Sequence, residues 1–354
     1  MSSPAFAPKA CYSTDYATRR ACRDACTIEI CPLKLSFWAG YIPSLAANSL
    51  FAALFGLTLI LFLVQAAWSR KFIAFSVAMI SGSVLELLGY IGRIMAHNKP
   101  FDENPFLLQI ICLTIGPAFY AAGLYFCLSR IVETFGAENS RLKAGLYPKI
   151  FIPCDFFSLV LQALGGGMAS AATHSGKDPR PGNHIMIAGL AVQVVTLFFY
   201  IVLASDFAFR TYRRISKLGK AHALEPKHAR LRDSLRFRGF VGALIFATLC
   251  IFTRSVYRVA ELSEGWSGHL ILTQKYFIGL EGAIVAAGIL SLNAFHPGLC
   301  FKEGYVKNKK LKGEKKSWFG RNSKKVRADG ESETYGGVVK EEPKNAGPGF
   351  DYAA

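Results

Sequence analysis

The sequence predicts an all-α integral membrane protein, a bundle of seven transmembrane helices with the N-terminus outside and the C-terminus in the cytoplasm. Of the 354 residues, 52% are hydrophobic and only 18% are charged, whereas soluble domains carry about 25% charged residues. The apolar residues lie in long runs separated by short polar gaps, a pattern typical of a multi-pass membrane protein. The basic residues gather in alternate gaps, and this bias predicts the orientation.

Seven stretches are long and apolar enough to cross a bilayer. A hydrocarbon core of about 30 Å needs roughly 20 helical residues, and each stretch reaches that length. The sequence does not contain the alternating segments of about ten residues that build a membrane β-barrel. We expect the spans at about 41–67, 72–92, 106–132, 150–172, 185–209, 239–260 and 272–295.

The distribution of Lys and Arg gives the orientation and explains the formal net charge of +17. Loops one, three and five and the C-terminal tail together hold 29 of the 41 basic residues, and the opposite side holds nine. Because cytoplasmic loops are enriched in Lys and Arg, this side should face the cytoplasm and its anionic lipid. The charge therefore requires no nucleic-acid partner.

Three regions follow from this division of the chain. Residues 1–40 are expected to form an extracellular segment that contains cysteines, and residues 41–300 the seven-helix membrane domain. Residues 301–354 are rich in Lys, Glu and Gly and poor in aliphatic side chains, a composition that predicts a basic, disordered cytoplasmic tail.

Four of the nine cysteines, Cys11, Cys22, Cys26 and Cys31, lie in the segment expected outside. An even set of cysteines on the oxidising side of a membrane indicates two disulfides, although four cysteines still allow three connectivities. Zinc is the alternative, but no matching pair of histidines lies nearby. We therefore expect neither a metal nor another cofactor.

Polar residues inside the spans are the candidates for function. An ionisable residue within the membrane costs at least about 2.5 kcal/mol on insertion scales, so it normally faces the bundle interior. Four spans carry polar residues three, four or seven positions apart, on one helical face. These residues are Glu86, Tyr90 and Arg93 in the second span, Asp155, Ser158 and Gln162 in the fourth, Arg254, Arg258 and Glu261 in the sixth, and Gln274 and Glu281 in the seventh.

The helical rise places several of these charges at a common depth. At 1.5 Å per residue, Glu86, Arg254 and Glu281 should converge in the outer half of the membrane, with Asp155 nearer the cytoplasm. Such residues could be ion pairs and hydrogen bonds that only hold helices together. An apolar bundle can pack with small residues alone, however, so the constellation favours function. The predicted substrate path consists of Glu86, Tyr90, Arg93, Asp155, Gln162, Arg254, Arg258, Glu261 and Glu281.

Five motifs follow one another along residues 40–300. They are Tyr41-Ile-Pro-Ser44 with Asn48 and Phe51, Glu86-x-x-Gly89-Tyr90-x-x-Arg93, Asp155 with Gln162 and Gly165 to Gly167, Arg254-Ser-x-Tyr-Arg258-x-x-Glu261, and His296-Pro297-Gly298. Their order resembles that in the fungal lipid-translocating exporter family, the RTA-like proteins named for resistance to aminocholesterol. Two positions depart from the family's pattern, because Gln274 stands in place of an acid and Glu281 in place of an aspartate.

The resemblance implies a multi-pass plasma-membrane protein that moves amphiphilic lipids, such as sphingoid long-chain bases, and xenobiotics, giving tolerance to toxic lipids. Membrane lipids and amphiphilic small molecules are then its partners, and the sequence does not identify a protein partner. Other members of the family are associated with porphyrin or haem movement, so the resemblance leaves the substrate open.

A receptor and an enzyme are the two alternative classes of function. A seven-helix receptor-like sensor or regulator of lipid stress shares the topology, but Arg130 at the end of the third span has no acidic residue before it. A membrane hydrolase would need several histidines and a carboxylate around a metal. His97, His174, His184 and His269 instead fall in loops or at span ends. We therefore expect a transporter without catalytic residues and keep the sensor as the alternative.

Overall fold

The computed structural model describes residues 11, 13, 15–29, 31–38, 41–70, 72–224, 228–265 and 268–301. All the elements below belong to one compact unit, Met1–Tyr305. Except for Phe301, the predicted cytoplasmic tail lies outside the described residues.

Within these residues, seven helices are long and apolar enough to cross a membrane, and no strand occurs. The predicted all-α bundle with seven spans is therefore confirmed. Most of the helices extend a few residues beyond the predicted spans, because hydropathy marks only the apolar part of each helix. The helices are α2 (Leu45–Ser69), α3 (Ile73–Asn98), α4 (Glu103–Phe135), α5 (Leu146–His174), α6 (Arg180–Ala223), α8 (Leu235–Ser263), and a seventh made of α10 (Gln274–Tyr276), a π-helix (Phe277–Ala283), α11 (Ile284–Ala294) and α12 (Pro297–Cys300).

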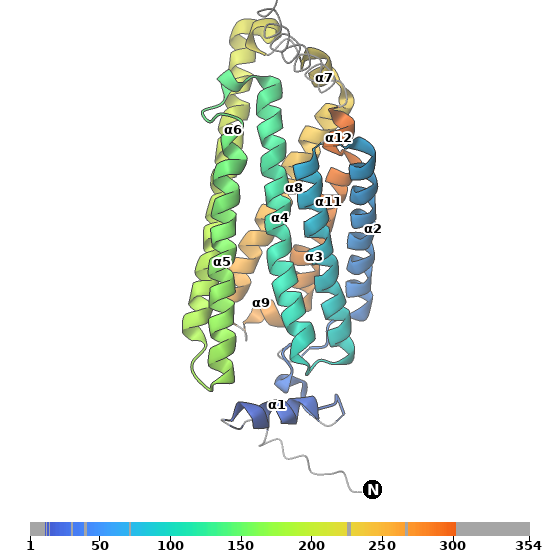
Figure 1. Ribbon diagram of the computed structural model, residues 1–354, viewed down its shortest axis with the longest axis vertical. Coiled ribbons are helices and arrows are strands. Elements are labelled where there is room, and N and C mark those ends of the chain that lie inside the picture. Colours follow the sequence, from blue (N-terminus) through green and yellow to red (C-terminus); the bar gives the residue numbers. More distant parts are fainter. Residues whose placement is uncertain are drawn as a thin grey trace, which may run out of the picture. The chain divides into compact units, whose positions relative to one another are not determined.

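The remaining elements are short and lie at the two ends of the bundle (Figure 1). One end carries α1 (Tyr16–Asp24) and α9 (His269–Leu272), and we call it the α1 end. The other carries α7 (Ala229–Asp233), and we call it the α7 end. Two single turns of 3₁₀-helix occupy Leu33–Leu35 and Ala137–Asn139.

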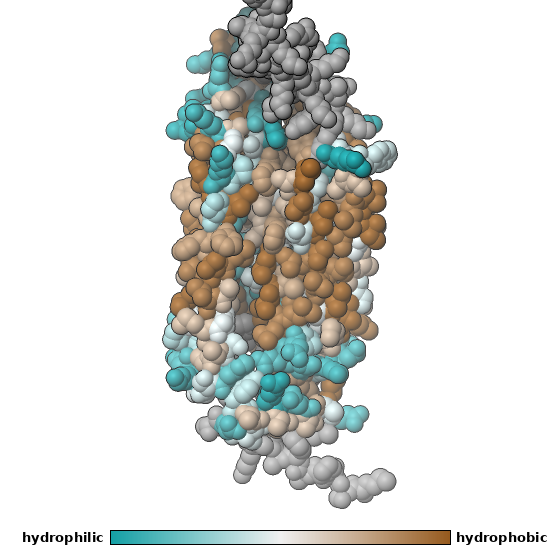
Figure 2. Space-filling view, viewed as in Figure 1, coloured by the Kyte–Doolittle hydropathy of each residue, from teal (hydrophilic) through white to brown (hydrophobic). Residues whose placement is uncertain are grey.

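Helix α4 is the centre of the bundle. It contacts α3, α5, α6 and α8, and 56% of its most apolar stretch is buried, against 22% for α2. The other spans pack in chain order around it, α2 on α3, α5 on α6 and α8 on α11, and α11 also contacts α2. Figure 2 shows an apolar band around the middle of the visible face, between hydrophilic ends. This is the surface expected of helices that face lipid.

Helices α5 and α6 pack backbone against backbone through glycines. A Cβ added at Gly165 would collide with the backbone nitrogen of Met186, and one at Gly182 with that of Ala169. At Gly189 an added Cβ would come 2.9 Å from the Gln162 nitrogen. Small residues permit this close approach in membranes, where helices associate mainly by packing and hydrogen bonds.

Candidate functional site

Every residue of the predicted substrate path is buried, with 0% to 6% of its surface exposed. The structure divides the path into two sets, apart from Tyr90, which lies one turn from Glu86 on α3. One is a charged cluster formed by α3, α8 and the π-helix. The other is a polar stripe on α5. We call the first set the Arg–Glu cluster, and its members are Glu86, Arg93, Arg254, Arg258, Glu261 and Glu281.

Arg254 lies at the centre of the Arg–Glu cluster. Its Nη2 atom is 2.5 Å from Oε1 of Glu281 on the π-helix, and the same nitrogen donates to the backbone carbonyl of Leu113 on α4. One guanidinium therefore connects α8, α4 and the seventh span. Of the three charges that the helical rise placed at one depth, two are therefore joined directly, and Glu86 lies near them without a hydrogen bond to either.

Arg258 and Glu261 form a second ion pair, one helical turn further along α8. Nη1 of Arg258 lies 2.5 Å from Oε2 of Glu261, and Oε1 of Glu261 accepts from the hydroxyl of Tyr257 at 3.3 Å. Nη2 of Arg258 reaches Oγ1 of Thr114 on α4 at 3.5 Å. Each of these two arginines thus already has an acidic partner of its own.

Glu86 differs from the other two acids of the Arg–Glu cluster. It is fully buried, and neither carboxyl oxygen has a hydrogen-bond partner among the described residues. Its carboxyl group lies directly on α4, because a Cβ added at Gly116 would come 3.1 Å from Oε1. The hydroxyl of Tyr90, one turn along α3, is likewise buried and without a hydrogen-bond partner in the described part of the chain.

Arg93 is surrounded by neutral groups. Its Nε donates to Oδ1 of Asn48 at 2.9 Å and its Nη1 to Oε1 of Gln109 at 2.8 Å. The guanidinium also lies 3.7 Å from the ring centre of Phe277 and 4.8 Å from that of Trp38. Sequence reasoning missed these four residues as a group, although Asn48 and Gln109 are visible as polar residues within apolar spans.

The polar stripe on α5 is separate from the Arg–Glu cluster. Oδ2 of Asp155 accepts from the hydroxyl of Tyr125 on α4 at 2.8 Å. Nε2 of Gln162 donates to Oγ of Ser158 at 2.8 Å and to Oε1 of Gln193 on α6 at 3.3 Å. Within the described residues, no hydrogen bond or ion pair connects Asp155 or Gln162 with the Arg–Glu cluster.

The N-terminal segment carries two disulfides, Cys11–Cys22 and Cys26–Cys31. The sulfur atoms of Cys11, Cys22 and Cys26 lie within 4.8 Å of one another. Since all three belong to disulfides, none of them has a thiolate to offer a metal ion.

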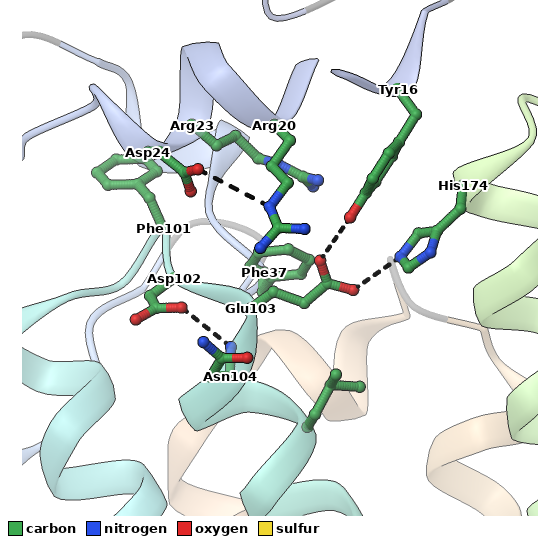
Figure 3. A pocket seen from close by; sticks show the side chains of 11 residues that line it. Tyr16, Arg20, Arg23, Asp24, Phe37, Phe101, Asp102, Glu103, Asn104 and His174 are labelled. Atoms are coloured by element: carbon green, nitrogen blue, oxygen red, sulfur yellow. Dashed lines mark hydrogen bonds and ion pairs between the residues drawn. The ribbon is translucent and has the colours of Figure 1, made fainter. Parts of the chain in front are cut away.

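A pocket of about 180 Å³ lies between α1, α4 and the end of α5 (Figure 3), and no sequence pattern predicts it. Glu103 projects into this pocket, where Oε2 accepts from the hydroxyl of Tyr16 at 3.1 Å and Oε1 lies 3.0 Å from Nε2 of His174. Burial, together with the negative charge of Glu103, raises the pKa of Tyr16 above its ordinary value of 10.0. The contact holds α1 against the ends of two spans.

Comparisons with known proteins identify the family of the chain. Residues 79–304 match the family model described as RTA1 like protein. The sphingoid long-chain base transporter RSB1 of Saccharomyces cerevisiae (strain Lalvin EC1118) is 37% identical over 288 residues, which cover 75% of either chain.

A second relative is protoporphyrin uptake protein 1 of Saccharomyces cerevisiae, 29% identical over 223 residues, 62% of this chain and 67% of the relative. No solved structure matches the chain. The family model covers more than half of the sequence, including every residue of the Arg–Glu cluster, and the chain therefore belongs to the RTA1-like family.

Proposed function

We propose that the protein moves amphiphilic lipids with a cationic headgroup, sphingoid long-chain bases or similar molecules, and xenobiotics across the plasma membrane, giving tolerance to toxic lipids. The name of the relative that is 37% identical supports lipid as cargo. The single structural observation that carries the proposal is the Glu86 carboxyl group, buried at the centre of the bundle without a hydrogen-bond partner among the described residues.

The cationic headgroup is the obstacle to movement of such a lipid across the bilayer. A protonated amine cannot cross hydrocarbon cheaply, whereas its tail can stay in lipid. A buried carboxylate without another hydrogen-bond partner can accept a charge-assisted hydrogen bond from the ammonium. Glu281 can also bind the ammonium when the Arg254 side chain moves away, since Oε2 of Glu281 has no hydrogen-bond partner within the described residues either.

The second set of path residues extends the proposal toward the α7 end. Asp155 is a buried acid whose Oδ1 has no hydrogen-bond partner in the described part of the chain. It offers the headgroup a second carboxylate on the way across the bilayer, while Gln162 stabilises the α5–α6 contact beside it. The path thus consists of two acidic positions, Glu86 and Asp155, separated by apolar packing.

For the orientation, we propose that the α1 end faces the outside and the α7 end the cytoplasm. The two disulfides support this, because disulfides persist in oxidising surroundings. The concentration of Lys and Arg in the loops of the opposite end agrees. In this arrangement residues 1–40 form an external cap and residues 301–354 a cytoplasmic tail.

We also propose that the protein acts without catalysis. The named relatives are described as a transporter and an uptake protein, which favours translocation over both catalysis and receptor-like regulation. A regulator would have to sense lipid without moving it, so measured movement separates the two.

Reconstitution tests the proposal. The purified protein is placed in sealed vesicles, and transbilayer movement of a fluorescent long-chain base is followed for wild type, Glu86→Gln and protein-free vesicles. We expect movement that depends on the wild-type protein. Its rate should fall at least about tenfold in Glu86→Gln, because a neutral amide cannot form an ion pair with an ammonium.

The matched control is Glu133→Gln, which removes an acid from an exposed ion pair with Arg130 at the end of α4. This variant should move the base at the wild-type rate. Movement no faster in wild-type vesicles than in protein-free ones would contradict translocation and favour the receptor-like regulator.

A further inference from the structure

The environment of Glu86 raises a question that the transport proposal leaves open, namely what occupies this carboxyl group when no substrate is present. Its surface is completely buried, and neither oxygen accepts a hydrogen bond from any described residue. A bare carboxylate in such a place is strongly disfavoured, since burial of an unpaired charge costs far more than burial of a neutral acid. The group needs a partner or a proton.

The neighbouring charges do not provide that partner. On α8, Arg254 is bound to Glu281 and to the Leu113 carbonyl, and Arg258 is bound to Glu261. Both arginines attract the Glu86 charge at a distance, and Glu281 on the π-helix repels it. Helix α2 contains no charged residue.

The uncharged titratable groups nearby are hydroxyls and a thiol. Tyr90 lies on α3 itself, and Tyr120 and Cys112 are on α4; all three experience the charge of Glu86. The Tyr120 hydroxyl donates to Oγ of Ser83 rather than to Glu86. None of these groups can cancel a negative charge, because each is neutral or negative.

Space also limits the occupant. The carboxyl group lies against the α4 backbone at Gly116, where an added Cβ would come 3.1 Å from Oε1. The pocket described above lies at the α1 end, and no residue of the Arg–Glu cluster lines it. A hydrated metal cation needs several oxygen ligands, whereas a proton needs no additional room.

We propose that Glu86 is an exchangeable proton site, and that a proton and the cationic headgroup occupy its carboxyl group in turn. This inference rests on the proposed function for its second half, the headgroup. In the resting state Glu86 is a neutral carboxylic acid. When the headgroup arrives, the O–H bond breaks, the proton passes to water, and the carboxylate accepts hydrogen bonds from the ammonium. One positive charge replaces another, so the charge of the site is unchanged.

The π-helix is the element that opens the site. Its seven residues, Phe277–Ala283, contain Glu281, and π-turns within α-helices are frequent at functional sites. A shift of this segment to α-geometry changes the direction of Glu281 and releases Arg254 toward Glu86. The arginine then stabilises the Glu86 carboxylate while the proton leaves. In consequence, transport of the base couples to proton movement in the opposite direction.

Two measurements on the purified full-length protein test the inference. The first is infrared spectroscopy without substrate, at neutral pH, comparing wild type with Glu86→Gln. We expect the carbonyl stretch of a protonated carboxylic acid in wild type, missing from Glu86→Gln, retained at a shifted position in Glu86→Asp, and unchanged in Glu133→Gln. Glu86→Asp keeps the test valid if Glu86→Gln does not fold.

The second measurement records protons released into weakly buffered solution when a long-chain base is added, with bound base determined in parallel. On the order of one proton per bound base is expected from wild type, and none from Glu86→Gln.

The proton site at Glu86 and the exchange of its proton for the headgroup are tested separately. A wild-type spectrum that lacks the Glu86-dependent carboxylic acid band overturns the proton site, whatever the transport assay gives. If the band is present but the base does not bind, the proton site stands and the proposed function is contradicted. Binding of the base without proton release would overturn the exchange.

Discussion

Neighbouring residues on one face of α3 have opposite electrostatic surroundings. Glu86, Tyr90 and Arg93 are all almost completely buried. Arg93 makes hydrogen bonds and ring contacts on several sides, whereas Glu86 makes no hydrogen bond with any described residue. Arg93 is therefore suited to hold α3 in position, and Glu86 is suited to change its partner. Residue type and spacing alone do not distinguish these roles.

The pair of Arg254 and Glu281 gives a prediction about stability. Arg254→Gln should destabilise the protein by about 3–5 kcal/mol, because it leaves a buried carboxylate without its partner. The double variant Arg254→Gln with Glu281→Gln should recover a large part of that loss, since both charges are then gone. Thermal unfolding in detergent measures both variants. A double variant less stable than the single one would mean that the two residues do not act as a pair.

Arg93→Lys tests the fixed role assigned to Arg93. Lysine has one compact ammonium group instead of a planar guanidinium. It therefore cannot donate hydrogen bonds to Asn48 and Gln109 at the same time or stack flat on Phe277. We expect a loss of roughly 2–3 kcal/mol, from hydrogen bonds to a charged group. The control is Arg130→Lys, at an exposed ion pair, which should unfold like wild type. Equal unfolding temperatures for the two variants would contradict the account of Arg93.

At the scale of elements, the helices differ in how they are held together. Helices α5 and α6 approach so closely that three glycines have no room for a side chain. The seventh span is broken into short α-segments around a π-helix. We therefore regard α5 and α6 as one rigid pair, and the seventh span as the element that moves during transport.

The glycine run on α5 provides a matched pair of variants. An added Cβ at Gly165 would overlap the backbone of α6, whereas at Gly167 nothing lies within 4 Å. Gly165→Ala should cost about 1–3 kcal/mol through overpacking, and Gly167→Ala should cost almost nothing. Melting temperatures of the two variants in the same detergent provide the comparison. If both variants melt together, α5 and α6 do not pack as described.

The contact between α1 and the bundle gives a prediction about pH. The pKa of Tyr16 is raised, so its neutral form is favoured in the folded protein. The stabilising contact with Glu103 is therefore complete at neutral pH and is lost as the pH rises through the pKa of Tyr16. The difference between the absorbance titrations of wild type and Tyr16→Phe should show that the Tyr16 hydroxyl ionises above pH 10. In the Glu103→Gln background the same difference should move to lower pH; an unchanged midpoint would exclude the influence of Glu103.

At the scale of the whole molecule, the sequence was sufficient for the fold class. Apolar runs of about 20 residues have few alternatives in a membrane protein, and all seven became helices. The partners within the bundle were less accessible to prediction. Spacing showed that Glu86 and Arg93 share a face, but not that Asn48, Gln109 and two rings would surround the arginine.

The pocket at the α1 end could not be predicted because it depends on how a short cap packs. Tyr16 and Glu103 are 87 positions apart, and no pattern in either segment points to the other. The π-helix at Glu281 was equally hidden. Hydropathy describes the span as continuous, whereas the local hydrogen-bond pattern changes within it.

The central claim is that a buried acid carries a cationic headgroup through the bundle. It is tested most directly by comparing, in vesicles containing the wild-type protein, the initial rates of transbilayer movement of a long-chain base and of its N-acetyl derivative, which has the same tail but no positive charge. The account predicts protein-dependent movement of the base at least about tenfold faster than that of the derivative. Equal protein-dependent rates for the two molecules would contradict it.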